Sequence, residues 1–253
     1  TKLVGSWTVF TTFSTDQGAT WSLPLAISTG GDNQPWPSDI AVAPNGDVYA
    51  TFHAGLWAGA TGYTQVLRST DGGVTFPNVS TPFAAGQSDV SDNVKDGTGS
   101  GVSIPGLQFW MLGSGQPWIL PDPAQPGNVY VVTNDDPDNT HGSGDDADVV
   151  FARSTDNGAT WATSTIPDGG GTAHQVFPMA AIDQLGNIAV AWFDTRSGAT
   201  NSLGNNLLDV FATYSTDGGL TWATAFQAVS YTHLRAHETK ANLVCQSRMP
   251  SSA

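Results

Sequence analysis

Short segments of alternating hydrophobic and polar residues predict β-strands along most of this chain. Ile40–Val42 and Val48–Phe52 flank Asn45-Gly46, a dipeptide typical of tight hairpin turns. The same arrangement recurs at Trp118–Leu120 with Val129–Val132 and at Met179–Ile182 with Ile188–Trp192. We therefore expect a series of antiparallel hairpins with little helix.

A second turn recurs in the motif S-T-D-x-G-x-T-[W/F]. Its four copies are Ser14–Trp21, Ser69–Phe76, Ser154–Trp161 and Ser215–Trp222. Ser and Asp side chains accept hydrogen bonds from nearby backbone N–H groups, and Gly permits a positive φ. We expect the final aromatic to pack against the sheet. The defining positions are Asp16, Gly18, Trp21, Asp71, Gly73, Phe76, Asp156, Gly158, Trp161, Asp217, Gly219 and Trp222.

One repeat thus runs strand, turn, strand, longer loop, strand, motif turn, strand. Four antiparallel strands in such a unit form one blade of a β-propeller. Residues 1–228 contain three such units and the outer half of another. The predicted fold class is all-β, a β-propeller with about three and a half blades and an incomplete ring.

The motif resembles the Asp-box, or bacterial neuraminidase repeat, of the sialidase superfamily. The resemblance covers residues 1–228 and implies a secreted or cell-surface bacterial propeller that acts on carbohydrate. Propellers of this family have six or more blades, so the resemblance implies that the native chain continues.

Residues 229–253 differ in composition from the rest and contain the only Cys and the only Glu, Cys245 and Glu238. The run Ser230–Thr239 resembles translated sequencing-adapter read-through. We expect this segment to be a non-native tail that follows the propeller domain, residues 1–228.

Charge and composition exclude several function classes. The 253 residues include 22 acidic and 8 basic ones, for a net charge of −14, which disfavours binding to a phosphate backbone. No apolar run approaches the roughly 20 residues of a transmembrane helix. The single Cys excludes an internal disulfide and a Cys-rich metal site.

The two ends of each unit differ in expected role. Alternate loops of a meander lie on one side, so the Asp-boxes share one face, and the resemblance places the active site on the opposite face. The Asp-box aspartates are therefore interpreted as structural. The candidates for ligand binding on the opposite face are Trp36, Trp57, Arg196 and His174, and the weak candidates for catalysis are Asp194, Arg196, His53 and Asp135.

The loop 134–148 is rich in aspartate and glycine. Oxygen ligands suit Ca²⁺, although the spacing is not that of an EF-hand. The candidate ligands are Asp135, Asp136, Asp138, Asp145 and Asp146, and a solvated acidic loop is the alternative. No other cofactor is expected. Asp148 and Asp209 occupy matching positions at the starts of predicted strands.

Three functions are left open. The sialidase resemblance implies three clamping arginines and a Tyr–Glu pair, but residues 1–228 contain no Glu, and Arg68 and Arg153 directly precede Asp-boxes. Related Asp-box propellers cleave xyloglucan with two aspartates, and others are non-catalytic glycan- or protein-binding modules. We expect a glycoside hydrolase with an incomplete catalytic set in this chain, with the binding module as the alternative; the oligomeric state is open.

Overall fold

The structure is a computed structural model that describes residues 7–29, 35–54, 63–84, 116–135, 147–202 and 204–229. These residues form four antiparallel sheets, one of two strands and three of four strands. The predicted all-β propeller fold is confirmed. No helix in the described part of the chain could cross a membrane. The expected tail lies outside the described residues, apart from Val229.

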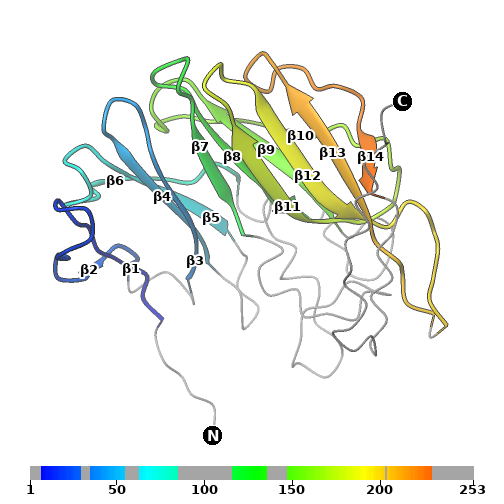
Figure 1. Ribbon diagram of the computed structural model, residues 1–253, viewed down its shortest axis with the longest axis horizontal. Coiled ribbons are helices and arrows are strands. Elements are labelled where there is room, and N and C mark those ends of the chain that lie inside the picture. Colours follow the sequence, from blue (N-terminus) through cyan, green and yellow to red (C-terminus); the bar gives the residue numbers. More distant parts are fainter. Residues whose placement is uncertain are drawn as a thin grey trace, which may run out of the picture.

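The sheets follow one another along the chain and lie side by side as a fan (Figure 1). The first sheet is β1 (Phe10–Thr11) and β2 (Leu25–Ala26). The second is β3 (Trp36–Val42), β4 (Val48–Ala54), β5 (Tyr63–Ser69) and β6 (Asn78–Ser80). The third is β7 (Trp118–Pro121), β8 (Val129–Asp135), β9 (Asp148–Ser154) and β10 (Ala162–Thr165). The fourth is β11 (Gln175–Ile182), β12 (Ile188–Asp194), β13 (Asp209–Ser215) and β14 (Phe226–Val229).

The strand register is the same in the three complete sheets. The first residue of the second strand pairs with the Asp-box serine, as Ile188 does with Ser215. The last residue of that strand pairs with the start of the third strand, as Asp194 does with Asp209 and Asp135 with Asp148. A seven-residue strand separates these two ends by roughly 20 Å. The matching positions predicted for Asp148 and Asp209 are therefore correct.

Hydrophobic side chains from facing sheets form the core between them. Tyr130 and Phe151 of the third sheet pack with Ile188, Val190 and Trp192 of the fourth sheet. A second cluster joins the second and third sheets in the same way. Each sheet therefore needs a neighbour to cover its apolar face.

The outer face of the fourth sheet has no such neighbour among the described residues. Ala189, Ala191 and Phe193 occupy the register positions that Tyr130, Val132 and Asn134 occupy in the third sheet, where all three are buried. Here Phe193 is 37% exposed. In the adjacent strands, Tyr214 and Phe226 are each 52% exposed. This face is apolar across the whole sheet.

The Asp-boxes form one repeated hydrogen-bonded turn. In the third sheet, Ser154 Oγ accepts from the backbone N–H of Gly158 at 2.8 Å, and Asp156 Oδ1 accepts from that of Thr160 at 2.8 Å. The same bonds occur in the other three copies. The hydroxyl and backbone donors of the threonine, with the serine, lower the pKa of each Asp-box aspartate to about 2.

The packing expected for the Asp-box aromatics holds in three copies. Phe76, Trp161 and Trp222 are partly buried, and Trp222 meets Phe151 edge to face at 5.2 Å between ring centroids. Trp21 instead is 63% exposed. The reason is that no described sheet precedes the first one, so this ring has no neighbouring face to cover.

Candidate functional site

A charged cluster lies in the seam between the third and fourth sheets, at the end opposite the Asp-boxes. β12 ends at Asp194, and the following turn carries Arg196. The link between β10 and β11 contributes Asp168 and ends at Gln175, the first residue of β11. Asp148, at the start of β9 in the third sheet, adds a carboxyl that interacts with the charge of Asp168. We call Asp148, Asp168, Asp194 and Arg196 the seam cluster.

Arg196 connects Asp168 and Asp194 of this cluster. Its Nη2 forms ion pairs with Asp194 Oδ2 at 2.5 Å and with Asp168 Oδ2 at 3.4 Å. Its Nη1 donates to the Asp168 carbonyl oxygen at 2.8 Å. The guanidinium carbon lies 3.7 Å from the centroid of the Phe211 ring, a cation–π arrangement. The arginine is thus held rigidly by groups from β12, β13 and the link.

Asp194 is completely buried and surrounded by donors. Its carboxylate accepts hydrogen bonds from Trp192 Nε1 at 2.9 Å, from the backbone N–H of Arg196 at 2.7 Å and from Gln175 Nε2 at 3.4 Å. Such partners offset the cost of removing a carboxylate from water. With its oxygens occupied, Asp194 is suited to positioning Arg196.

Asp148 differs from Asp194 because it is only half-buried and carries an unusual pKa. Burial, and secondly the negative charge of Asp168, raise its pKa from 3.8 to about 6. A carboxyl that holds its proton to this pH can act as a general acid near neutrality. Asp135 is its register partner across the β8–β9 pair.

Two buried amides complete the seam. Asn134 Nδ2 donates to the backbone oxygens of Gln175 at 2.7 Å and Asp148 at 3.0 Å, and so joins the two sheets. Asn134 Oδ1, Gln175 Oε1 and Arg196 Nε are buried without a hydrogen-bond partner among the described residues. The link between β10 and β11 folds back on itself so tightly that a Cβ at Gly170 would lie 2.3 Å from Asp168 Oδ2.

The structure places several of the predicted site residues. His174, half-buried, directly precedes Gln175, and its backbone N–H donates to Thr195 Oγ1 at 2.9 Å. His53, buried, and Trp36, half-buried, pair in register in the second sheet, away from Arg196 in the fourth. Trp57, Asp136, Asp138, Asp145 and Asp146 lie outside the described residues.

Sequence reasoning did not single out Asp168, Asn134, Gln175 or Phe211. Asn134 begins the acidic loop 134–148, but nothing in the sequence pattern connects it or Asp168 to Arg196. The expectation that Arg68 lies toward the Asp-box face is confirmed, because its Nη2 pairs with Asp47 of the β3–β4 turn at 2.6 Å.

The described residues include no group of three or more His, Cys, Asp or Glu side chains that could hold a metal ion. Four of the five candidate Ca²⁺ ligands are outside that part of the chain. The calcium hypothesis therefore stays a prediction.

Comparison with known proteins gives independent information on this fold. The BNR/Asp-box repeat model matches residues 12–23 and 213–224, the first and last copies of the motif. The chain carries BNR/Asp-box repeats on a β-propeller fold. No curated protein matches this Asp-box propeller.

Solved structures share its fold. A GH93 α-L-arabinofuranosidase of Fusarium graminearum, in complex with arabinobiose, aligns with a TM-score of 0.55 and 17% identity, over 87% of this chain and 58% of the other. A Dyadobacter fermentans protein of unknown function gives 0.52 and 17% over the same shares. A Hadza microbial sialidase gives 0.46 and 17%, over 74% and 36%. The Asp-box propeller thus spans less than two thirds of these structures.

Proposed function

We propose that this protein is a glycoside hydrolase of extracellular carbohydrate whose reaction centre includes the seam cluster. The observation that carries the proposal is the half-buried carboxyl of Asp148, with a pKa of about 6, close to Asp168, which in turn pairs with Arg196. Glycosidases pair a carboxylic acid that protonates the leaving oxygen with a second carboxylate. The glycosidase neighbours support a carbohydrate-acting fold.

The residues divide the chemistry as follows. Asp148 would donate its proton to the glycosidic oxygen. Asp135 is the candidate for the second carboxylate, because residues directly opposite in a strand pair have Cβ atoms about 5 Å apart. Arg196 and His174 would contact sugar oxygens at the rim.

A neutral glycan fits this centre better than a sialylated one. The seam cluster contains one arginine, Arg196, which is already paired with two aspartates. Arg68 lies at the other end of its strand, where it pairs with Asp47. The net charge of −14 also repels anionic glycans. The sialidase-like alternative therefore requires clamping arginines from outside the described residues.

The test is hydrolysis by the intact protein of linear arabinan, xyloglucan, a nitrophenyl α-L-arabinofuranoside and a fluorogenic sialoside. We expect cleavage of a neutral substrate and a loss of 10²-fold or more in kcat for Asp148→Asn, on the order of a lost general acid. If the protein is instead a non-catalytic binding propeller, it should be retained on immobilised glycans without cleaving them. The Asp148→Asn variant should then be retained as well as the unchanged protein.

We also propose that a further sheet of the same repeat covers the outer face of the fourth sheet. The support is the equivalence of Ala189 and Ala191 to Tyr130 and Val132, which the next sheet buries. A crystal structure of the intact protein tests this proposal, since solvent over that face would contradict it.

A further inference from the structure

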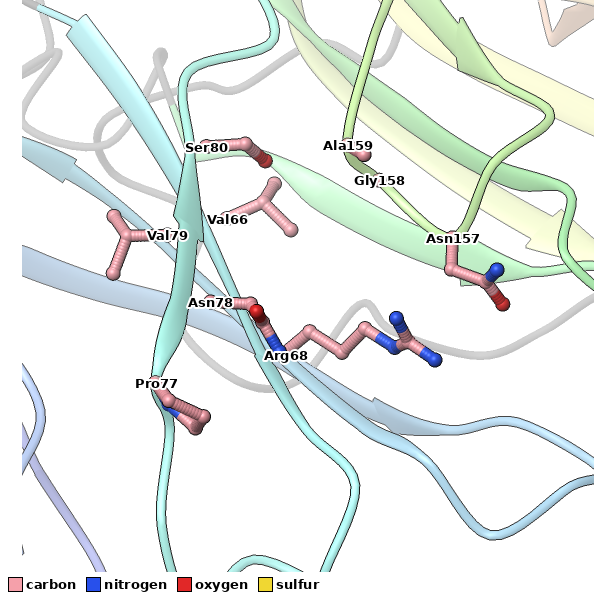
Figure 2. A pocket seen from close by; sticks show the side chains of 9 residues that line it. All are labelled: Val66, Arg68, Pro77, Asn78, Val79, Ser80, Asn157, Gly158 and Ala159. Atoms are coloured by element: carbon pink, nitrogen blue, oxygen red, sulfur yellow. The ribbon is translucent and has the colours of Figure 1, made fainter.

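A pocket lies at the Asp-box end of the molecule, in the seam between the second and third sheets (Figure 2). Its volume is about 330 Å³. Val66 and Arg68 of β5 and Asn78 of β6 form one side, and Asn157 in the Asp-box of the third sheet forms the other. The pocket is separated from the seam cluster by the length of the strands.

The next seam shows why this pocket exists. Val66 and Phe151 occupy the same register position, three residues before the Asp-box serine of their sheets. The Phe151 ring fills the space under the following Asp-box so closely that a Cβ at Gly219 would lie 2.2 Å from it. Valine is smaller, and a Cβ at Gly158, which is equivalent to Gly219, would meet Trp161 at 3.3 Å and no atom of Val66, so the space beside Val66 stays open. The space that Val66 leaves open is therefore filled by Phe151 in the seam between the third and fourth sheets.

The one charged side chain that lines the pocket, Arg68, is neutralised by an ion pair. Arg68 Nη2 and Nε both bond Asp47 Oδ2, at 2.6 and 2.8 Å. The carboxamides of Asn78 and Asn157 can each donate and accept. Ser80 Oγ accepts from Trp161 Nε1 at 3.1 Å and closes the outer edge.

We propose that this pocket binds a single neutral sugar ring, separately from the seam cluster. Hydroxyl groups match carboxamides that donate and accept, and the C–H face of a ring matches the apolar side chain of Val66. The neutralised arginine gives no preference for an anion. The volume is at the lower end of ligand pockets, roughly 300–1,000 Å³, which fits one ring and excludes a long oligosaccharide.

The test follows backbone amides of the ¹⁵N-labelled intact protein by NMR. L-Arabinose, D-galactose, D-glucose and D-xylose are titrated one at a time into the millimolar range. We expect saturable shifts at Asn78, Ser80 and Ala159 with at least one of these sugars. Val66→Phe, which copies the neighbouring seam, should abolish the shifts. Val74→Phe makes the same change at an exposed position outside the pocket and should preserve them.

Two results would overturn the proposal. One is the absence of saturable shifts at these amides with all four sugars. The other is binding that a folded Val66→Phe variant retains, which would place the ligand elsewhere. Asp148→Asn should leave the shifts unchanged, so the outcome is independent of whether the seam cluster is catalytic.

Discussion

Asp148, at the start of β9, lies close enough to Asp168 in the β10–β11 link for the charge of one carboxylate to oppose ionisation of the other. Burial is the larger cause of the raised pKa, and Asp168 adds to it. Arg196 pairs with Asp168 and with buried Asp194. Below about pH 6, Asp148 therefore keeps its proton while its carboxyl is still half-exposed to water.

This proton makes stability depend on pH in a defined window. The pKa of Asp148 is about 6 in the folded protein and 3.8 as the reference value, so between about pH 4 and 6 the folded state binds more protons than the unfolded state. The free energy of unfolding must then fall as pH rises through this window and level off above it. Asp148→Asn should remove that fall, worth about 1–2 kcal/mol after allowance for solvent screening. Urea unfolding of both proteins from pH 4 to 8 measures it, and parallel curves would contradict the assignment.

Removing the charge of Asp168 should lower the pKa of Asp148 only part of the way. In Asp168→Asn the repulsion is lost, but burial, the larger cause, is unchanged. A ¹³C-detected NMR titration of the Asp148 carboxyl reports the value directly. An unchanged midpoint would show that the two carboxyl groups do not interact.

The turns and strands could be predicted from the sequence because their determinants are local. Period-two alternation identified β4, β8 and β12, and Asp, Gly and Ser placed the turns. The contact of Arg196 with Asp168 could not be predicted in this way, since it depends on the path of a link between two sheets. Nor does the alternation in β12 reveal that Ala189 and Ala191 lack a covering sheet, because buried strands show the same pattern.

The Asp-box serines should differ in their contribution to stability. Ser154 is 1% exposed, and its hydroxyl accepts the backbone N–H of Gly158 away from water. Ser154→Ala should therefore reduce the free energy of unfolding by about 1–3 kcal/mol, the cost of an unsatisfied buried donor. Ser14 makes the same bond with Gly18 at an exposed turn, where water can replace the hydroxyl. Ser14→Ala is the matched control, and equal losses in urea unfolding would contradict the role of burial.

The open face of the fourth sheet should make residues 1–229 associate when they are produced alone. Water-exposed apolar surface of this breadth favours contact with another apolar face. Ala191→Asp, at the centre of the face, should reduce that association in sedimentation experiments. Ala159→Asp changes an exposed alanine in an Asp-box and is the control. A monomer without either substitution would count against an interface here.

Phe151 should be the side chain that closes the seam between the third and fourth sheets. It is 1% exposed, stacks with Tyr130 at 5.6 Å between centroids and meets Trp222 edge to face. Phe151→Val would give this seam the residue that the neighbouring seam has in Val66, and the cavity left behind should cost about 2–4 kcal/mol. Urea unfolding gives the loss, and a crystal structure of the variant would show a new hollow beneath Gly219. A loss below about 1 kcal/mol, as for a site that collapses without strain, would mean that the Asp-box moves inward to fill the space.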